Sequence, residues 1–264
     1  MATSSDAPDK LVLYRGFPAS NKYTWSPFVS KLEFRLRQSR IPYTLREGST
    51  QKGPSGKIPY VNIAPLTSGD TQDLVGDSSV IINTLVQKGL AEDLNAHLAP
   101  EQKATDMSIR ALCEDKLYFL GMAERWVDNF YIQRDHILES KPWALRFVIG
   151  NLIYNKNVST LHGQGSGRFT KEQQRKMREE IWTILEGLLA QRRRESGNRR
   201  GPFWMLGGEK PTEADAVVFA FANSVLVCDS CPASQTFVRG CGSVMEYASR
   251  IHDEYFADYQ KWKG

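Results

Sequence analysis

The sequence predicts a small α/β unit followed by a larger all-helical domain. Short apolar runs, interrupted by one amphipathic helical pattern, occupy about the first 90 residues. After the segment "EDLNAHLAP", the apolar residues recur at helical spacing over long stretches. We therefore expect two domains, an α/β domain at residues 1–92 and an all-α domain at residues 98–264.

The α/β unit begins with a predicted strand, helix and second strand. "KLVLYRG" is a short apolar run that ends at a glycine, and "IPYTLRE" is the second strand. Between them, Val29, Leu32 and Leu36 recur at helical spacing, and a serine–proline pair at Ser26 is a common helix start. The helix should end near Arg40. This order predicts a parallel strand pair joined by a right-handed crossover.

The second part of the unit has a loop, two strands and a helix. "GSTQKGPSGK" has the composition of a loop, and "IPYVNI" is a third strand with Pro59 at its head. "DLV" is a short fourth strand, close enough to the third to form a hairpin. In "DSSVIINTLVQKG", Asp77 or Ser78 caps a helix that Gly89 ends.

Three long helical patterns define the second domain. "TEADAVVFAFANSVLV" is apolar nearly all round and should be its buried central helix. The segment "PEQKATDMSIRALCEDKLYFLGMAERW" has an apolar face at Met107, Ile109, Leu112, Leu117 and Leu120. The segment "KEQQRKMREEIWTILEGLLAQRRR" has an apolar stripe at Met177, Ile181, Ile184, Leu185 and Leu188.

Composition and charge favour a globular protein without a nucleic-acid or membrane partner. The chain is 41% hydrophobic and 24% charged, and its net charge of +4 is too small to indicate nucleic-acid binding. The one basic cluster, "QRRRESGNRR", is predicted to be a solvated loop after a helix. The N-terminus lacks an apolar signal region, and the longest apolar stretch is short for a membrane span. We therefore expect a cytoplasmic location.

The four cysteines do not form the framework of a disulfide-rich domain in a chain of 264 residues. Cys228 and Cys231 form a C-x-x-C that follows an apolar helix, whereas a thioredoxin-type redox pair would lie between the first strand and the first helix. A zinc site would need further ligands at suitable spacing, and the four histidines show no such pairing. We expect free, mostly inert thiols and no metal.

Three stretches, in this order, resemble motifs of the cytosolic glutathione transferase superfamily: "GKIPYV", "GDSSVII" and "FWMLGGEKPTEADAVVF". In the last, Thr212 and Asp215 form an S/T-x-x-D box at a helix N-terminus. The resemblance implies a thioredoxin-like N-terminal domain, here with a loop in place of its usual second helix, and a helical C-terminal domain. It is closest to the failed-axon-connections and metaxin-like branch, while "SPF" is similar to the plant tau class.

The resemblance also implies that glutathione is the cofactor. Asp77–Ser78 at a helix N-terminus would supply an acid, a hydroxyl and free N–H groups for the γ-glutamyl end. A cis peptide at Ile58–Pro59 would expose the Ile58 backbone to the cysteinyl unit. The glycine carboxylate would meet a loop lysine, Lys57 or, alternatively, Lys52.

Ser26 is the candidate catalytic residue. A hydroxyl donor and a helix N-terminus both favour the thiolate form of glutathione over its thiol form. Ser26 would place its hydroxyl at such a helix N-terminus. Its hydroxyl could also simply cap the helix, and the two roles are compatible. Tyr14, Tyr23 and Thr24 are rival hydroxyls because the loop before Ser26 is long.

A second substrate would lie between the domains against an aromatic wall. Candidates for that wall, each of which would fit equally well as a core residue, are Trp25, Phe28, Tyr118, Phe119, Met122 and Trp126. Such a pocket suits a hydrophobic, conjugated small molecule.

The chain as a whole resembles a fungal branch of the superfamily that serves natural-product pathways. This implies glutathione-dependent trans/cis isomerisation of a polyene in secondary-metabolite biosynthesis. A conjugating, detoxifying transferase and a non-enzymatic metaxin-like interaction protein are the alternatives. A homodimer is expected from the family.

Overall fold

The structure, a computed structural model, describes residues 10–17, 20–67, 72–197 and 200–263. In the N-terminal domain, the four predicted strands and both helices are present, and a 3₁₀ turn, η1 (Ala64–Leu66), follows the third strand. The elements are β1 (Leu11–Tyr14), α1 (Pro27–Gln38), β2 (Tyr43–Arg46), β3 (Tyr60–Asn62), β4 (Leu74–Gly76) and α2 (Ser78–Gln87). They form a sheet of order β2-β1-β3-β4. As predicted, β1 and β2 are parallel and β3 and β4 form an antiparallel hairpin.

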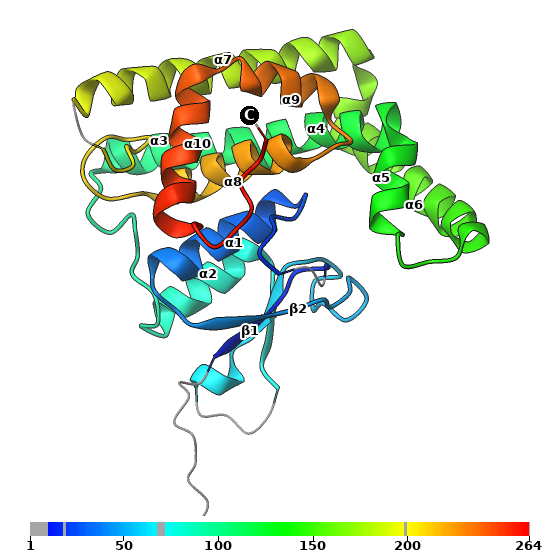
Figure 1. The fold of residues 1–264 in the computed structure, drawn as a ribbon, viewed down its shortest axis with the longest axis horizontal. Helices are drawn as coiled ribbons and strands as arrows, with labels where there is room; N and C mark the ends of the chain where they lie inside the picture. The colour runs from blue at the N-terminus through cyan, green and yellow to red at the C-terminus, as the bar shows by residue number, and fades with distance from the viewer. Residues whose placement is uncertain (1–9, 18–19, 68–71, 198–199, 264) are drawn as a thin grey trace, which may run out of the picture.

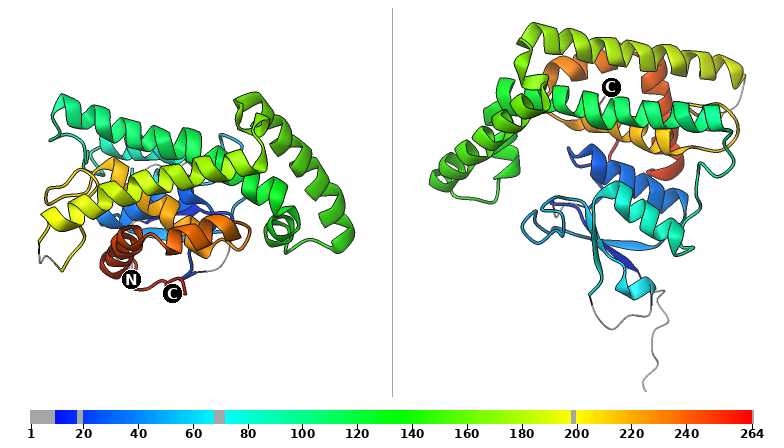
Figure 2. Two further views of the ribbon diagram at one scale, coloured as in Figure 1. Left: turned by 90° about the horizontal axis from the view of Figure 1, so that it is seen from above. Right: turned by 180° about the vertical axis from the view of Figure 1, so that it is seen from behind.

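The C-terminal domain is helical, as predicted, and the two domains make the thioredoxin-like plus all-α architecture (Figure 1). α8 (Glu213–Val227) is its buried centre, with α9 (Pro232–Arg239) and α10 (Gly242–Tyr255) packed against it and α7 (Lys171–Glu195) packed on α9 and α10. The preceding elements are α3 (Pro100–Ala111), η2 (Leu112–Leu117), α4 (Tyr118–Ala123), η3 (Glu124–Asp128), α5 (Phe130–Ile137), α6 (Trp143–Gln164) and η4 (Ser166–Arg168). Seen from above and from behind, α5 and α6 project to one side (Figure 2).

The predicted helix at residues 100–126 is present, but two π-helical segments, η2 and η3, interrupt its α-helical geometry. Its predicted apolar face is wrong at Met107, which is 63% exposed, because this residue lies about 200° around the helix axis from the buried Ile109. The α7 stripe is likewise wrong at Ile184, which is 48% exposed.

The basic cluster after residue 190 is also not a loop throughout. α7 continues to Glu195, because ion pairs hold its last turn: Arg192 contacts Glu195 at 2.6 Å and Arg193 contacts Glu246 of α10 at 2.7 Å. These pairs neutralise Arg192 and Arg193, so the first part of the cluster is a paired helix end, while residues 198–199 of the predicted loop lie outside the described residues.

α1 lies between the sheet and α8, so it is buried on nearly every side (Figures 1 and 2). Its apolar residues Leu32 and Leu36 pack on the sheet, while Phe34 belongs to the core around α8. The remaining positions carry charged side chains that are buried too, namely Lys31, Glu33 and Arg35.

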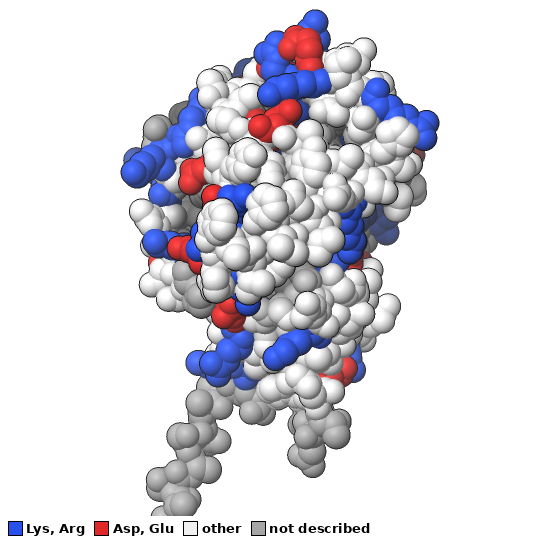
Figure 3. Space-filling view, turned by 90° about the vertical axis from the view of Figure 1, so that its right-hand side faces the viewer, with Lys and Arg blue, Asp and Glu red and all other residues white. Residues whose placement is uncertain are grey.

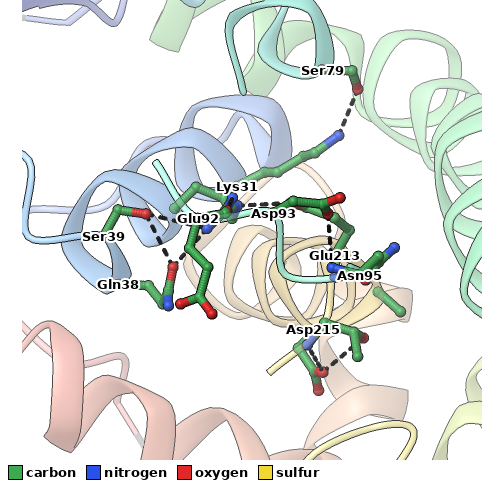
Figure 4. A network of polar contacts seen from close by, with 12 residues as sticks. Lys31, Gln38, Ser39, Ser79, Glu92, Asp93, Asn95, Glu213 and Asp215 are labelled. Carbon is green, nitrogen blue, oxygen red and sulfur yellow. Dashed lines mark hydrogen bonds and ion pairs between the residues drawn. The ribbon is translucent and has the colours of Figure 1, made fainter. Parts of the chain in front are cut away.

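Each buried charged side chain of α1 has a charged partner, either in the helical domain or next to the sheet. Arg35 Nε lies 2.9 Å from a carboxylate oxygen of Glu213 at the start of α8, and its guanidinium donates to the Glu92 carbonyl at 2.7 Å (Figure 4). Glu33 lies 3.3 Å from Arg15, which follows β1. Breaking such a pair leaves an uncompensated buried charge, so these contacts fix the relative position of the two domains.

The α8 N-terminus is organised as the sequence predicts. Asp215 is fully buried, accepts from the N–H and hydroxyl of Thr212 at 2.8 and 3.0 Å, and also accepts from the N–H of Met205. The Tyr247 hydroxyl donates to the same carboxylate at 2.9 Å. Burial raises the pKa of Asp215 to about 6, although all four of these hydrogen bonds lower it.

Among the described residues, no single helix is both long and apolar enough to cross a membrane. Only α8 and α9 taken together pass the length and composition test, and they are bent by 116° from one another.

α6 exposes several large apolar side chains, such as Trp143, Phe147 and Leu152. The side of the molecule from which α5 and α6 project has a broad surface without charged residues (Figure 3).

Candidate functional site

The sheet brings the predicted binding segments to one of its ends. Tyr14 at the end of β1 pairs with Tyr60 at the start of β3, which in turn pairs with Gly76 at the end of β4. Pro59 precedes Tyr60 and Asp77 follows Gly76, so these two residues stand next to each other. The segment that leads from β1 to Ser26 leaves from the same end.

The Ile58–Pro59 peptide is cis, as predicted. Ile58 contacts the segment that follows β1, because a Cβ added to Gly16 would lie 2.4 Å from Ile58 Cδ1. Gly16 has a φ of +87°, which a glycine adopts without cost. Within the described chain, the N–H and C=O of Ile58 form no hydrogen bond. They are therefore available to pair with an extended peptide.

The N-terminus of α2 has both used and unused donors. Asp77 is its N-cap, and one carboxylate oxygen accepts from the N–H groups of Ser79 and Val80 at 2.9 and 3.3 Å. Ser78, the first helical residue, is 2% exposed, and its N–H and hydroxyl form no hydrogen bond with any described residue. An anionic group placed here would meet two free donors and the positive end of the helix dipole.

A buried lysine that sequence reasoning missed stands beside this helix end. Lys31 of α1 is 2% exposed, and its ammonium donates to Ser79 Oγ at 2.7 Å (Figure 4). It also donates to a carboxylate oxygen of Glu114 in η2 at 2.7 Å. One side chain thus joins α1, the α2 N-terminus and the helical domain. Its sequence neighbours give no signal for this, because Lys31 lies outside the apolar stripe of α1.

Ser26 occupies the N-cap position of α1, but its side chain does not cap the helix. The Ser26 N–H donates instead to Thr24 Oγ1 at 3.3 Å. The N–H groups of Phe28 and Val29 in the first turn also have no hydrogen-bond partner among the described residues. The half-buried Ser26 hydroxyl and the N–H groups at this helix end therefore have no hydrogen-bond partner among the described residues.

One of the three rival hydroxyls, that of Tyr23, is engaged in the helical domain. Tyr23 is 8% exposed and lies in the core beside Phe219 and Phe256. Its hydroxyl oxygen is 2.8 Å from His252 Nδ1, so the hydroxyl faces the helical domain. Burial raises the pKa of Tyr23 far above its ordinary value.

The two remaining rivals are positioned by their own contacts. Thr24 is 4% exposed and its oxygen already accepts the Ser26 N–H. Tyr14 stacks on Tyr60 with 4.4 Å between ring centroids. Lys52 and Lys57 are both exposed in the loop that replaces the usual second helix, and the structure does not distinguish between them.

A cavity of about 40 Å³ lies where α1 begins, between α4 and α8. Tyr118 and Met122, four residues apart on one helix face, line it together with Pro27 and Phe221. Phe28 stands beside Tyr118, with 5.0 Å between ring centroids. These three predicted pocket residues are therefore gathered at the domain junction.

The other predicted wall residues do not line this cavity. Phe119 and Trp126, seven residues apart, lie on a different helix face and pack with Leu161 of α6. Trp25 stacks on His136 of α5, with 3.5 Å between ring centroids, and its carbonyl accepts from Arg125 at 3.1 Å. The pocket is thus narrower than the sequence predicts, because three of the six predicted wall residues pack against α5 and α6 instead.

Comparison with known proteins agrees with this architecture. Residues 27–130 match the family described as the glutathione S-transferase N-terminal domain. A glutathione transferase from Phanerochaete chrysosporium superposes with a TM-score of 0.57 at 13% identity, over 98% of this chain and 100% of that chain. The chain has the glutathione S-transferase fold. The family match begins after β1 and Ser26, so it carries no information on the Ser26 hydroxyl.

Two further solved structures with the glutathione S-transferase fold were determined with glutathione. Ure2p in complex with glutathione has a TM-score of 0.55 at 13% identity, over 94% of this chain and 91% of that one. A family member from Pseudomonas fluorescens, with two glutathione molecules bound, has a TM-score of 0.54 at 14% identity, over the same shares of the two chains. Within the described residues, no group of three His, Cys, Asp or Glu side chains could hold a metal ion.

Proposed function

We propose that this protein is a glutathione-dependent enzyme that adds the glutathione thiolate to a conjugated, hydrophobic small molecule. The observation that carries the proposal is the set of unused polar groups at one end of the sheet. These are the backbone of Ile58, the N–H and hydroxyl of Ser78, and the hydroxyl of Ser26. Buried or half-buried polar groups normally find partners in the chain, so such a set fits a polar, peptide-like ligand.

Glutathione matches these groups one by one. Its cysteinyl backbone would pair with Ile58 beside the cis peptide, and its γ-glutamyl carboxylate would accept from Ser78. The free oxygen of Asp77 would accept from the ammonium group. Lys57 or Lys52 would meet the glycine carboxylate. Solved proteins of this fold with bound glutathione support the assignment.

The thiol would then lie at the start of α1. A Ser26 O–H donated to sulfur, together with the free N–H groups of the first helical turn, stabilises the thiolate relative to the thiol. The thiolate is the nucleophile, and it adds to the electrophilic conjugated system: one S–C bond forms, the π bond at that carbon breaks, and its electron pair moves to the electron-withdrawing end of the system. The double bond at that position becomes a single bond about which rotation is free.

The fate of the adduct separates isomerase from transferase. If the S–C bond breaks after rotation, the polyene leaves with altered double-bond geometry and glutathione is regenerated. If the adduct takes up a proton and leaves, the enzyme is a conjugating transferase. The resemblance to the glutathione transferase-like isomerase of the fungal pseurotin route favours the first outcome. The cavity of about 40 Å³ is smaller than a polyene, so Phe28, Tyr118 and Met122 have to move apart on binding.

The Ser26→Ala variant tests the assignment. We expect kcat to fall about 100-fold, as for loss of one donor to a developing anion, while the glutathione Kd stays within about twofold. Tyr14→Phe is the matched control, because it removes one hydroxyl from the same region and should keep kcat. Unchanged turnover in Ser26→Ala with intact glutathione binding would refute the catalytic role of Ser26.

Two cheap experiments separate the alternatives. Retention on immobilised glutathione favours an enzyme, whereas a chain that flows through favours the metaxin-like interaction protein. A candidate polyene incubated with substoichiometric glutathione then gives a product of unchanged mass for isomerisation, or a glutathione adduct for conjugation.

We further propose that the protein acts as a homodimer in the cytoplasm. All four cysteines are free in the structure, which fits a reducing compartment. Sedimentation equilibrium tests the dimer, because it gives the mass of the particle directly.

A further inference from the structure

The C-x-x-C pair lies at the bend between α8 and α9, where the sequence predicts inert thiols. Cys228 is the C-cap of α8 and Cys231 is the N-cap of α9. Both line the cavity at the start of α1, and Trp25, the residue before Ser26, packs directly on them. The two thiols therefore share a pocket with the candidate catalytic helix end.

A chain of polar contacts orients Cys228. Its sulfur lies 3.1 Å from Ser230 Oγ, which donates to Gln133 Oε1 at 2.5 Å, and Arg125 donates to the same Gln133 oxygen at 3.1 Å. Cys231 Sγ donates to the Cys228 carbonyl at 3.3 Å, so the second thiol is held against the first residue.

The charge environment favours a thiolate at Cys228. Burial alone would raise its pKa, but a hydrogen bond from the Cys231 thiol and the positive charge of Arg125 outweigh burial and lower the pKa below its ordinary value. The pKa of Cys231 is raised well above its ordinary value, first by its hydrogen bond to Cys228 and then by burial. Two other charges near the pair, Glu124 and Arg178, form an ion pair at 3.2 Å and largely cancel, while the carboxylate of Asp229, the residue after Cys228, is exposed to solvent.

We propose that Cys228 and Cys231 form a peroxide-reactive dithiol, with Cys228 as the attacking thiol and Cys231 as the resolving thiol. The closed cavity favours a small oxidant. Its volume of about 40 Å³ admits a water-sized molecule, and hydrogen peroxide is only slightly larger, so peroxide can reach Cys228 without the opening that a polyene or glutathione disulfide requires.

The reaction balances with peroxide as the only co-reactant. The Cys228 thiolate attacks one peroxide oxygen, an S–O bond forms, the O–O bond breaks, and hydroxide leaves and is protonated to water. Cys231 then attacks the Cys228 sulfur, so that an S–S bond forms and the S–O bond breaks. The departing hydroxide takes the Cys231 proton. Two thiols and one peroxide become one disulfide and two waters, and a dithiol reductant restores the pair.

Intact-mass spectrometry tests the proposal on the full chain. After brief exposure to hydrogen peroxide, the wild-type protein should be two hydrogens lighter, and peptide mapping should show a Cys228–Cys231 disulfide. Cys231→Ser should stop at a sulfenic acid on Cys228 that a cyclic dione reagent captures. Cys228→Ser should show neither product. Cys241→Ser is the matched control, because Cys241 is another buried cysteine at a helix N-cap and should leave oxidation unchanged.

Two further readouts bear on the mechanism rather than on folding. The oxidation rate of the wild-type protein should be half-maximal at a pH below the value of about 8.5 that an ordinary thiol gives. Bulky aromatic disulfides should modify Cys228 at least 10-fold more slowly in the folded than in the unfolded protein. Oxidation of Cys228 no faster than of Cys241, absence of the disulfide in the wild type, or equal reactivity toward bulky disulfides in both states would each overturn the proposal.

Discussion

The buried ammonium of Lys31 offers the sharpest test of how the domains are held together. Lys31→Met keeps the apolar stem but removes the charge that contacts Ser79 Oγ and Glu114 Oε1, each at 2.7 Å. The Lys31 side chain is 3% exposed and that of Glu114 is 19% exposed. Loss of one partner from a fully buried pair costs 3–5 kcal/mol, and partial hydration of Glu114 reduces this to about 3 kcal/mol.

The expected loss is large enough to measure by urea denaturation and by thermal melting. About 3 kcal/mol corresponds to a fall in Tm of roughly 6–12 °C for a chain of this size. Lys176→Met is the control: Lys176 is 71% exposed and 3.7 Å from Glu172, and an exposed pair contributes at most about 1 kcal/mol.

A double-mutant cycle with Glu114→Gln isolates the ion pair. In the wild-type background, Glu114→Gln should destabilise the protein, because it leaves the Lys31 ammonium buried with only Ser79 as partner. In the Lys31→Met background it should be neutral or stabilising, because it removes an unpaired carboxylate. A coupling free energy near zero, or a loss below about 1 kcal/mol for Lys31→Met, would refute the reasoning.

Two further variants probe the α2 and α8 N-termini. Asp77→Asn keeps the helix cap, since asparagine caps as well as aspartate, but it removes the negative charge proposed to bind the γ-glutamyl ammonium. The glutathione Kd, measured by calorimetry, should rise about 10-fold. The free energy of unfolding, measured by denaturation, should be nearly unchanged. An unchanged Kd would place the ammonium elsewhere. Burial raises the pKa of Asp215 from 3.8 to about 6, so the folded state binds its proton more tightly and stability falls as pH rises from about 4 to about 6. The free energy of unfolding of the wild type relative to Asp215→Asn should therefore decrease by about 3 kcal/mol across that range, whereas a constant difference would contradict the shift.

The elements of the N-terminal domain could be predicted because each has a local cause. A glycine ends β1, a serine–proline pair starts α1, and Asp77 caps α2 through hydrogen bonds to residues two and three positions later. The cis peptide before Pro59 could be predicted only from the resemblance of "GKIPYV" to a known motif. In each case the information lies within a few residues of the feature.

The missed features depend on contacts between distant residues. Tyr23 was a rival catalytic hydroxyl by its position in the loop, but its partner, His252, lies 229 residues away. Lys31 contacts residues 48 and 83 positions later. Helical periodicity identifies one apolar face, whereas α1 is buried between the sheet and α8. The positions outside its apolar face therefore carry buried charged side chains that form ion pairs. No pattern within α1 distinguishes such a lysine from a solvated one.

Ser26 shows how the local and distant signals combine. The sequence predicts its N-cap position correctly, but a capping serine would use its hydroxyl for the first turn, worth about 1 kcal/mol, and this one does not. Proline at the next position already lacks an N–H, and Thr24 takes the Ser26 N–H, so the first turn keeps two free donors and a free hydroxyl. In the proposed binding mode, these three groups would face the glutathione thiol. The unused cap is therefore what favours a catalytic over a purely structural role for Ser26.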